Sequence, residues 1–342
     1  MVVSGSASQT GDLLDPSTVG RYLVGRGLAG DPRRVRAALL GGGVSNVVLG
    51  VGTGTDAFVV KQALPRLRVA DEWRAPCGRV LTEAAALDLA ARLVPGVTPR
   101  VLDRDPERNV IVIERAPGSW SDWKRLLLQG RCDVGVAARL GGVLAAWHSA
   151  DVAGVDQRCV DLSAFEQLRV DPYYRTVMRR RPEHAERVGW HAEAMAGRRT
   201  ALVHGDFSPK NVLVGEGGAL WVIDFEVAHV GDPAFDVAFL LSHLLLKSVF
   251  RPADRDRYEV CASAFADSYL AAIPPSRRLD WGYVAGHVAC LMLARVDGKS
   301  PVEYLDAAQR GQARRIGAAL LCDPPSSPRG LWEVRGSELR RC

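Results

Sequence analysis

The sequence predicts an α+β protein with a small N-terminal lobe built on antiparallel strands and a larger, mainly helical C-terminal lobe. Between residues 34 and 61, three apolar segments alternate with glycine-rich turns, which is typical of an antiparallel meander. From residue 121 onwards, apolar residues recur at the three- and four-residue spacing of amphipathic helices. A chain of 342 residues is long enough for two such lobes, each with its own core.

Each element of the N-terminal half has a local signal. Asp15, followed by proline and serine, is a helix start, and Gly27 ends that helix. The glycine-rich segments 41–43 and 52–54 separate the strands of the meander. Apolar residues at helical spacing then predict a second helix, and two further apolar runs predict strands. The expected elements are a helix at 15–23, strands at 34–40, 47–51 and 57–61, a helix at 79–93, and strands at 98–102 and 109–113.

The C-terminal half is read in the same way. The segment 134–149 has a clear apolar stripe, and residues 150–200 contain two further helical segments. A strand, a glycine turn and a second strand over 212–223 predict a hairpin. Three more helices are expected, at 254–272, 281–294 and 300–321. We therefore divide the chain into a disordered N-terminus, an N-lobe, a C-lobe and a peripheral C-terminal tail, at residues 1–14, 15–116, 117–322 and 323–342.

The composition excludes several classes of protein. Hydrophobic residues make up 47% and charged residues 24%, which is ordinary for a soluble globular enzyme. The net charge of +5 is small and spread along the chain, whereas a nucleic-acid or membrane-surface protein would show clustered charge. No run reaches the roughly 18 apolar residues of a membrane helix, and the N-terminus lacks the features of a signal peptide. We therefore expect no nucleic-acid and no membrane partner, and the oligomeric state stays open.

The seven cysteines are scattered along the chain. They form neither a CxxC pair nor a cluster with histidine, and their number is odd. This pattern predicts reduced thiols and a cytoplasmic protein rather than a disulfide framework.

The most informative stretch is residues 203–226, VHGDFSPKNVLVGEGGALWVIDFE. Asn211 follows Asp206 by five residues, and the hairpin that begins after Asn211 ends at Asp224. Such a hairpin would bring these three side chains together at one edge. Carboxylate and amide oxygens suit Mg²⁺, which takes few protein ligands and shares phosphate oxygens. The sequence therefore predicts that these three side chains form a magnesium site at this edge.

This stretch resembles the catalytic and metal-binding loops of protein-kinase-like phosphotransferases. Gly205 stands where protein kinases have an arginine, and Asp224 begins a DFE sequence in place of DFG. In these respects, and in a GDPxxD element at 231–236, the chain is similar to the aminoglycoside phosphotransferase family of small-molecule kinases. The resemblance implies a bilobal protein-kinase-like fold. It also implies that Asp206 is the catalytic base and that Asn211 and Asp224 bind Mg²⁺. By the same resemblance, Asp236 hydrogen-bonds the backbone of the catalytic loop.

The same resemblance assigns the nucleotide and the reaction. It implies transfer of the γ-phosphoryl group of ATP or GTP, bound with Mg²⁺, to a hydroxyl of a small molecule. Lys61, after three apolar strand residues, would bind the phosphates, and the glycine-rich loop would cover them. The hinge between the lobes would read the adenine edge through its backbone, although an ordinary loop is the alternative there. The expected nucleotide-binding residues are Gly42, Gly43, Ser45, Asn46, Lys61, Glu83, Glu114 and Ala116.

Lys61 needs an acidic partner to stay ordered and charged. Glu83 lies in the first turns of the helix predicted at 79–93, and we assign it as that partner. Glu72 and Asp71 are the alternatives, which the helical position of Glu83 disfavours.

The acceptor is less well specified. The sequence KQALP that begins at Lys61, followed by an arginine and a tryptophan, is similar to 5-methylthioribose kinases, but Phe225 stands where those enzymes tend to have proline. Aminoglycosides are polycations whose pocket should be acidic, whereas the last ninety residues are balanced in charge. We therefore expect a neutral or anionic sugar or a sugar-like metabolite, such as a nucleoside-like compound or a secondary metabolite. An aminoglycoside or another antibiotic is the alternative. Arg295, Asp297 and Lys299 would either line the acceptor pocket or form a solvated loop.

Two alternatives belong to other classes of protein. A catalytically silent kinase-like protein would bind nucleotide or act as a scaffold without turnover. A protein kinase is disfavoured, because only a few residues separate Asp224 from the GDP element at 231–233, which leaves no room for an activation segment.

Overall fold

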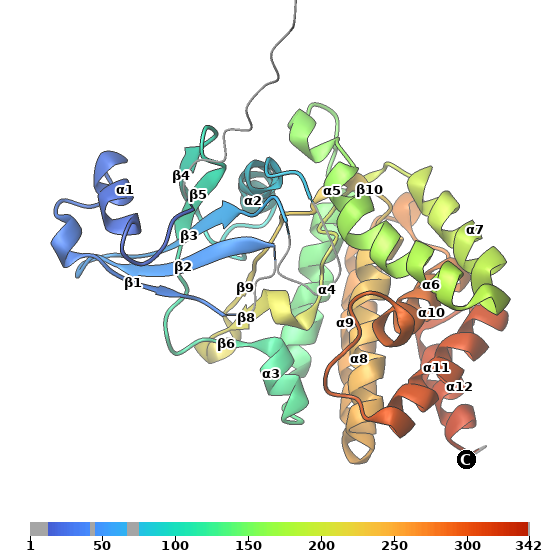
Figure 1. Ribbon diagram of the computed structural model, residues 1–342. Helices are drawn as coiled ribbons and strands as arrows, with labels where there is room; N and C mark the ends of the chain where they lie inside the picture. The colour runs from blue at the N-terminus through green and yellow to red at the C-terminus, as the bar shows by residue number, and fades with distance from the viewer. Residues whose placement is uncertain (1–12, 42–44, 67–74, 341–342) are drawn as a thin grey trace, which may run out of the picture. The chain divides into compact units, whose positions relative to one another are not determined.

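The computed structural model describes residues 13–41, 45–66 and 75–340, and the chain folds into two compact units (Figure 1). The first, here called the β unit, comprises Met1–Ala84 and Arg100–Arg115. The second, the helical unit, comprises Ala85–Pro99 and Ala116–Cys342. The predicted α+β class is confirmed, because one unit is built on an antiparallel sheet and the other is mainly helical.

The β unit contains a five-stranded antiparallel sheet in the order β1-β2-β3-β5-β4. The predicted meander is confirmed, because β1, β2 and β3 pair in chain order. The strand predicted at 98–102 begins later, at Val101, since Pro99 has no N–H to donate to a ladder. The elements of this unit are α1 (Val19–Gly25), β1 (Arg36–Leu39), β2 (Asn46–Gly52), β3 (Ala57–Ala63), the start of α2 (Arg79–Leu93), β4 (Val101–Asp105) and β5 (Val110–Glu114).

The core of the β unit lies between its sheet and α1. Leu23 of α1, Leu49 of β2 and Val112 of β5 are fully buried there. Val60 of β3 belongs to the same core. Because side chains alternate along a strand, Lys61 lies on the opposite face of β3 from Val60. Lys61 therefore lies on the face of the sheet opposite the core that the sheet forms with α1.

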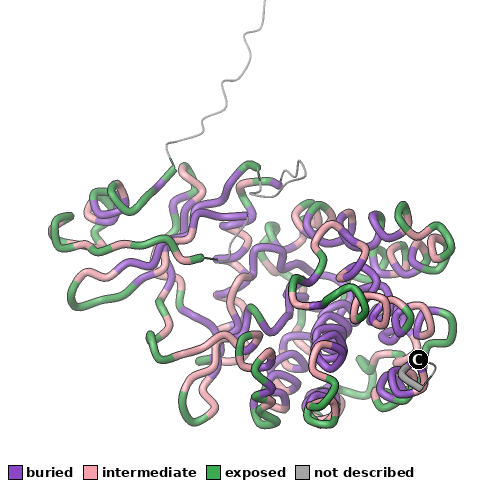
Figure 2. The backbone as a smooth tube through the Cα atoms, turned by 60° about the horizontal axis from the view of Figure 1, so that its bottom comes forward, coloured by how far each residue is buried: buried purple, intermediate pink, exposed green. Residues whose placement is uncertain are grey.

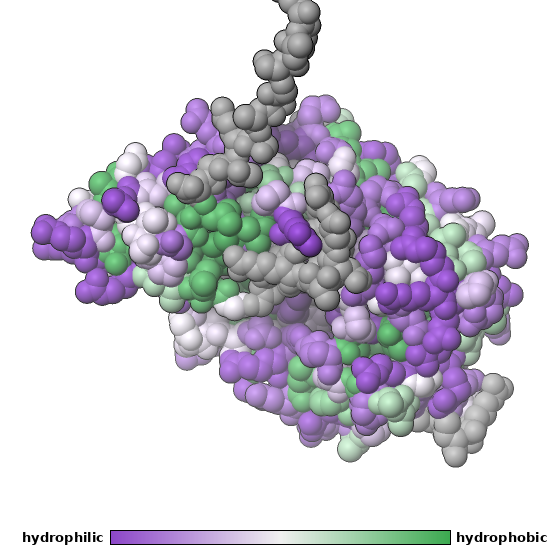
Figure 3. Space-filling view, in the orientation of Figure 1, coloured by the Kyte–Doolittle hydropathy of each residue, from purple (hydrophilic) through white to green (hydrophobic). Residues whose placement is uncertain are grey.

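The helical unit is organised around two buried helices, α8 (Ala234–Phe250) and α10 (Trp281–Asp297). Both are apolar on nearly all sides and buried along almost their whole length (Figure 2). Hydrophilic residues nevertheless cover most of this unit on the face shown in Figure 3, because other helices surround these two. In the described part of the chain, no helix combines the length and the apolar composition that a bilayer crossing requires. The other helices are α3 (Trp123–Leu128), α4 (Val134–Ser149), α5 (Ser163–Phe165), α6 (Thr176–Arg180), α7 (Ala185–Ala196), α9 (Arg255–Ala272), α11 (Ala307–Cys322) and α12 (Pro328–Arg340).

Two small antiparallel sheets in the helical unit carry the segment 203–226. In one sheet β7 pairs with β10, and in the other β8 lies between β6 and β9. The predicted hairpin over 212–223 is confirmed by the pairing of β8 with β9. The strands are β6 (Ser121–Asp122), β7 (Ala201–Val203), β8 (Val212–Val214), β9 (Leu220–Val222) and β10 (His229–Gly231).

The predicted helices between residues 150 and 200 include an unusual one. A π-helix, Glu166–Arg175, joins α5 to α6 without a break and contains Pro172. Proline has no N–H and does not fit the α-helical hydrogen-bond pattern, so the wider π turn accommodates it. Segments of this kind occur mostly at functional sites. This one carries Arg169, whose side chain is described below.

The C-terminal region differs from the prediction in two places. The helix expected at 300–321 begins only at Ala307, because Asp306 and Gln309 form a reciprocal capping box that starts α11 there. Residues 323–342, expected to be a peripheral tail, contain α12, whose Trp332 is buried. Arg335 of α12 is also buried and donates hydrogen bonds to the backbone and side-chain oxygens of Ser248. The order of this segment depends on its packing against distant helices, which its own composition does not reveal.

Helices α4 and α9 approach each other closely at a glycine. A Cβ atom on Gly141 would lie 2.3 Å from the carbonyl oxygen of Phe265 and 3.0 Å from Cβ of Ser268. Gly142, the next residue of α4, has open space around the same position. The α4 backbone therefore leaves room for glycine alone at position 141.

We expect Gly141→Ala to lower the free energy of unfolding by about 1–3 kcal/mol, because the added methyl group would force the two helices apart. Gly142→Ala is the matched control. It should leave stability unchanged or raise it by up to about 1 kcal/mol, since alanine favours a helix over glycine. Urea unfolding followed by circular dichroism measures both values, and equal free energies for the two variants would contradict the close approach.

Candidate active site

The loop of residues 204–211, which follows β7, is held by a buried carboxylate. Asp236, in the first turn of α8, is fully buried. Its two oxygens accept hydrogen bonds from the N–H groups of His204 (2.6 Å) and Gly205 (2.9 Å). The prediction that Asp236 binds the backbone of this loop is confirmed. Since charged hydrogen bonds of this kind are strong, they fix the direction in which the chain leaves the strand.

Gly205 adopts a conformation that its position requires. Its φ of 75° lies in the left-handed region, and a Cβ there would be 2.7 Å from the carbonyl oxygen of Val227. Both the backbone angle and the space favour glycine. The replacement of an arginine by glycine, noted in the sequence, therefore has a steric reason.

His204 connects the 204–211 loop to the end of β9. Its Nδ1 accepts the N–H of Asp206 (3.1 Å), so Nε2 carries the proton and donates it to the carbonyl of Ile223 (3.1 Å). Burial lowers the pKa of His204, which keeps the ring neutral and this tautomer in place. Because Ile223 precedes Asp224, one imidazole sets the positions of both acidic segments.

Asp206 and Asn211 lie together in this loop, and both are buried. The Asn211 side chain donates from Nδ2 to the Asp206 carbonyl (3.0 Å) and to Asp206 Oδ2 (2.9 Å). Its Oδ1 is therefore the atom that remains to bind a cation. The structure brings the acid and the amide together as the hairpin predicted.

Asp224 follows β9 and has a φ of 71°, an unusual angle for a residue with a side chain. Backbone strain of this kind is found mainly where a side chain must be held in a defined direction. The negative charge of Asp224 acts on Asp206 and works to raise its pKa. The two carboxylates are thus near enough to repel each other, and a divalent cation bound by hard oxygen ligands would relieve that repulsion.

Two cations lie against the Asp206 carboxylate. Arg169 Nη2 and Lys210 Nζ are each 2.9 Å from Oδ2. Burial alone would raise the pKa of Asp206, but the charges of Arg169 and Lys210 outweigh burial and hold the pKa below its ordinary value. Asp206 is therefore ionised at neutral pH.

The sequence analysis assigned no role to either cation. Lys210 carried a signal, because it lies in the same loop four residues after Asp206. Arg169 carried none, since it comes from the π-helix in an arginine-rich region far upstream. Its Nε also donates to the carbonyl of Gly205 (2.9 Å). The guanidinium of Arg169 thus binds Gly205, the residue that stands where protein kinases have an arginine.

In the β unit, the predicted ion pair between Lys61 and Glu83 is present. Lys61 Nζ donates to Glu83 Oε1 over 2.7 Å, and both side chains are buried. A buried pair with this geometry holds the ammonium in one position. The alternative partners, Glu72 and Asp71, lie outside the described residues.

The glycine-rich loop is described only in part. Gly42 and Gly43 lie outside the described residues, whereas Ser45 and Asn46 are buried at the start of β2. Arg79, at the start of α2, donates to the carbonyl of Ser45, which anchors the chain just after the loop. The structure thus gives the position of one end of the loop.

The two residues predicted to read an adenine edge, Glu114 and Ala116, follow one another closely at the end of β5. The N–H of Glu114 donates to the carbonyl of Arg100 (3.0 Å), and its carboxylate accepts from Arg100 Nε (2.6 Å). The N–H of Glu114 is therefore engaged within the β unit. Ala116 is the first residue of the longer segment of the helical unit.

The residues predicted to line the acceptor pocket form different contacts in the structure. Asp297 accepts paired hydrogen bonds from both Arg181 and Arg314, at 2.8–3.1 Å. Lys299 forms an ion pair with Asp171 (3.0 Å). Asp297 therefore stabilises the junction of three segments of the helical unit, and its carboxylate is occupied on both oxygens.

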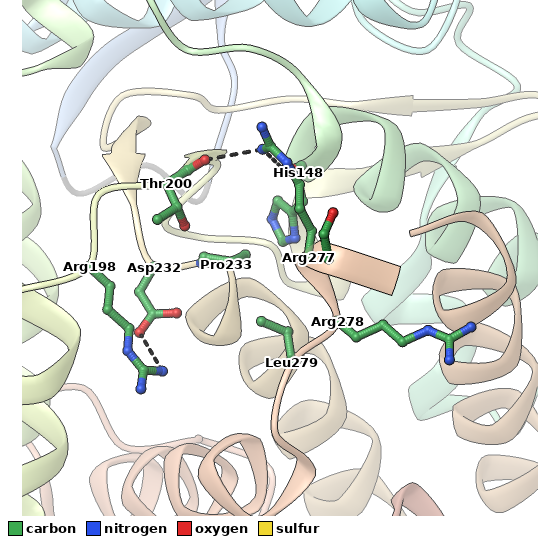
Figure 4. A pocket seen from close by; sticks show the side chains of 9 residues that line it. His148, Arg198, Thr200, Asp232, Pro233, Arg277, Arg278 and Leu279 are labelled. Carbon is green, nitrogen blue, oxygen red and sulfur yellow. Dashed lines mark hydrogen bonds and ion pairs between the residues drawn. The ribbon is translucent and has the colours of Figure 1, made fainter. Parts of the chain in front are cut away.

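A separate pocket of about 480 Å³ lies within the helical unit (Figure 4). Arg198 lies beside Asp232, with Nη1 3.8 Å from Oδ2, and Asp232 also accepts a hydrogen bond from the Tyr283 hydroxyl (2.6 Å). Arg277 donates to the carbonyl of Thr200 (3.3 Å). These lining groups hold the protein's own backbone and carboxylate, and the residues predicted for nucleotide and metal lie elsewhere.

Comparison with known proteins gives this geometry a family. Residues 36–279 match the phosphotransferase enzyme family, abbreviated APH, and this range contains both the Lys61–Glu83 pair and the 204–211 loop. The chain belongs to the phosphotransferase enzyme family. The predicted relationship to aminoglycoside phosphotransferase-like kinases is thereby confirmed.

Individual relatives of this phosphotransferase are kinases. The methylthioribose kinase of Pectobacterium carotovorum subsp. carotovorum (strain PC1) is 30% identical over 82% of this chain and 84% of its own length. The methylthioribose kinase of Pectobacterium atrosepticum is also 30% identical, over 62% of this chain and 60% of its own length. Among solved structures, an amicoumacin kinase in complex with AMP-PNP, Ca²⁺ and Ami has a TM-score of 0.54, with 15% identity over 90% of this chain and 95% of that chain. This structural likeness supports the protein-kinase-like fold, and the family and its methylthioribose kinase members support a kinase that acts on small molecules.

Asp297 provides a test of the packing around the site. The carboxylate is partly buried, which alone would raise its pKa, but hydrogen bonds from Arg314 and Arg181 lower the pKa to about 2. A lowered pKa stabilises the fold above the unfolded-state value near 3.8, and this stability is lost as the pH falls towards 2. We expect Asp297→Asn to lower the free energy of unfolding by about 1–2 kcal/mol at pH 7.

The difference between wild type and Asp297→Asn should shrink between pH 4 and pH 2, as measured by urea unfolding at each pH. Asp267→Asn, at an exposed position of α9, is the control and should have little effect at any pH. A constant difference across this range would show that the two arginines do not stabilise the ionised carboxylate.

Proposed function

We propose that this phosphotransferase moves the γ-phosphoryl group of ATP to a hydroxyl of a sugar or sugar-like small molecule. The observation that carries the proposal is the environment of Asp206, a buried and ionised carboxylate bound by Arg169, Lys210 and Asn211. GTP is the alternative nucleotide. Such transfers depend mainly on positioning and on charge neutralisation, which this arrangement can supply.

Asp206 is the proposed catalytic base. It accepts a hydrogen bond from the acceptor hydroxyl and orients the oxygen towards the γ-phosphorus. As the new O–P bond forms, the bond from the γ-phosphorus to the β–γ bridging oxygen breaks, the hydroxyl proton passes to Asp206, and ADP leaves. Arg169 and Lys210 keep the carboxylate ionised and in place until that step.

Asn211 and Asp224 are the proposed ligands of Mg²⁺. Their oxygens match the preference of this ion, with phosphate oxygens as the remaining ligands. When bound, the ion supplies positive charge that offsets the charge of the phosphates. The repulsion between Asp206 and Asp224 supports a cation at this place, since it would be relieved there.

The β unit is proposed to bind the nucleotide. Lys61, held by Glu83, binds the phosphates, and the loop of Gly42, Gly43, Ser45 and Asn46 covers them. The backbone at Glu114 and Ala116 binds the adenine edge. Support comes from the buried Lys61–Glu83 ion pair, which holds the ammonium of Lys61 in a fixed position inside the β unit.

For the acceptor, a sugar is the first candidate. Its support is a methylthioribose kinase that is 30% identical and matched over 84% of its length. The aminoglycoside alternative has less support, since polycations need an acidic pocket and the cations around Asp206 would repel them. We also propose a cytoplasmic location, because the six cysteines within the described residues are unpaired.

Acceptor-stimulated release of ADP tests the proposed activity. The purified protein, ATP and Mg²⁺ would be combined with methylthioribose, other neutral sugars, aminoglycosides and amino alcohols in turn. Release stimulated by a sugar supports the proposal. Absence of nucleotide binding by the wild type would overturn it, and nucleotide binding without turnover on any acceptor would favour the silent kinase-like alternative.

We expect Asp206→Ala to reduce phosphoryl transfer at least about 100-fold, because the proton of the acceptor would have no base. Binding of ATP should change little, since Asp206 is not assigned to the nucleotide. Steady-state kinetics and calorimetric titration with AMP-PNP measure the two properties. Asp267→Ala, at an exposed position, is the control, and near-normal turnover by Asp206→Ala would refute the assignment of the base.

We expect Asp224→Ala to remove the dependence of nucleotide binding on Mg²⁺, because the metal loses its one carboxylate ligand. AMP-PNP would be titrated with Mg²⁺ and with EDTA, for wild type and variant. The wild type should bind at least about tenfold more tightly with Mg²⁺, and the variant equally in both conditions. An unchanged Mg²⁺ effect in the variant would assign the metal to other residues.

A further inference from the structure

Three basic side chains from three different helices of the helical unit lie near one another. Lys124 belongs to α3, Lys247 to α8 and Arg295 to α10, and we call them the cationic cluster. The charges of Lys124 and Arg295 act on Lys247. None of the three lies close to another in the sequence, so their convergence is produced by helix packing.

Lys247 is the most unusual member of the cationic cluster. It is fully buried, and its Nζ lies 3.5 Å from the carbonyl of His243 and 5.5 Å from the ring centre of Tyr304. No carboxylate among the described residues forms an ion pair with it. Burial, with the charges of Lys124 and Arg295, lowers the pKa of Lys247 to about 7. A buried ammonium with so few compensating groups is costly to the fold.

Arg295 does not use all of its N–H groups in hydrogen bonds within the described residues. Its Nη1 donates to the backbone carbonyl of Ser300, to Ser300 Oγ (3.0 Å) and to the Tyr173 hydroxyl (3.5 Å). Within the described part of the chain, neither the buried Nε of Arg295 nor the buried hydroxyl of Tyr304 has a hydrogen-bond partner. Unsatisfied buried donors of this kind indicate a missing acceptor.

The acids around the cationic cluster do not neutralise it. Glu303 is exposed and pairs with Lys124, and Asp122 caps α3 by accepting the N–H of Arg125. Arg295, and Lys247 in its protonated form, therefore keep an excess of positive charge, which an anion would offset.

The cationic cluster is connected to the proposed base through an aromatic ring. The guanidinium carbons of Arg169 and Arg295 each lie 5.9 Å from the ring centre of Tyr173. Arg169 is itself bound to Asp206 at 2.9 Å. Burial lowers the pKa of the neighbouring His243, and the charges of Lys247 and Lys210 lower it further. Lys210 is the second cation at Asp206. The cluster therefore lies next to the groups that bind the base.

We propose that the acceptor carries an anionic group, a phosphate or a carboxylate, which the cationic cluster binds while the reacting hydroxyl lies at Asp206. This inference rests on the proposed phosphotransfer at Asp206 and names the class of acceptor for that site. Lys247 and Arg295 would donate charged hydrogen bonds to the anion, and Tyr304 would add its hydroxyl. The buried charge then has a function in substrate recognition, and neutral sugars would leave it without a partner.

The test variant is Lys247→Met, which removes the charge and keeps most of the volume of the side chain. Replacing a buried, unpaired charge by an apolar side chain usually preserves or raises stability, so its Tm should equal or exceed that of the wild type. Arg329→Met is the matched control, because it removes a positive charge from an exposed position of α12.

Calorimetry in two steps separates the inference from the function on which it rests. The first step titrates AMP-PNP with Mg²⁺ into each protein, and absence of binding by the wild type would overturn the proposed function and the inference with it. The second step titrates inorganic phosphate, and separately acetate, into the nucleotide-loaded protein. We expect wild type and Arg329→Met to bind at least one of these anions, and Lys247→Met to bind it about tenfold or more weakly. Normal nucleotide binding with no anion binding by the wild type, or equal anion binding by Lys247→Met, would overturn the inference alone.

Turnover provides an independent measurement with matched acceptors. Glucose, glucose 6-phosphate and glucuronate share a ring and differ in charge. Stimulated ADP release that is greater with either anionic sugar than with glucose, and that loses this preference in Lys247→Met, supports the inference. A preference of the wild type for glucose would contradict it while leaving the phosphotransferase activity in place.

Discussion

Two hydrogen bonds that a buried carboxylate accepts give the 204–211 loop its direction. Asp236 lies in α8, which is buried along almost its whole length, so the packing of the core fixes its position. Because its oxygens bind the N–H groups of His204 and Gly205, the core also fixes the start of the loop. His204 then extends this order to the carbonyl of Ile223 and so to the segment that carries Asp224. The geometry of the candidate site thus depends on the rigidity of the helix that carries Asp236.

Charge balance around Asp206 is the second level of organisation. Burial and the neighbouring Asp224 favour the protonated acid, and Arg169 and Lys210 favour the carboxylate. The cations prevail, so the group stays ionised while it remains shielded from water. Arg169 is particularly informative, since it enters from a π-helix and also binds the carbonyl of Gly205. Arg169 thus supplies a guanidinium at Gly205, where the loop itself has no arginine.

The charges around Tyr173 bear on the proposed acceptor. One relative is named for methylthioribose and a structural neighbour was solved with amicoumacin, so related folds serve acceptors of very different chemistry. In this chain the helices around Tyr173 contribute the buried Lys247 and the partly buried Arg295, rather than the acids that a polycation would need. The proposed recognition of an anionic group follows from this charge pattern.

Local spacing was sufficient to predict the hairpin, the proximity of Asp206 and Asn211, and the pair of Lys61 with Glu83, because each depends on turn geometry or helix periodicity over short stretches. Long-range packing was needed for everything that joins distant segments. Of the charged residues involved, Arg295 was expected near an acceptor, whereas Arg169, Lys124 and Lys247 gave no sequence signal, since a charged residue reads the same in a chain whether it becomes exposed or buried. The fold of α12 was likewise missed, because its apolar residues gain order only from the helices that cover them. The sequence alone therefore determined which residues of the candidate site lie close together along short stretches. Only the tertiary structure decided their electrostatic surroundings, because burial sets the strength of each charge.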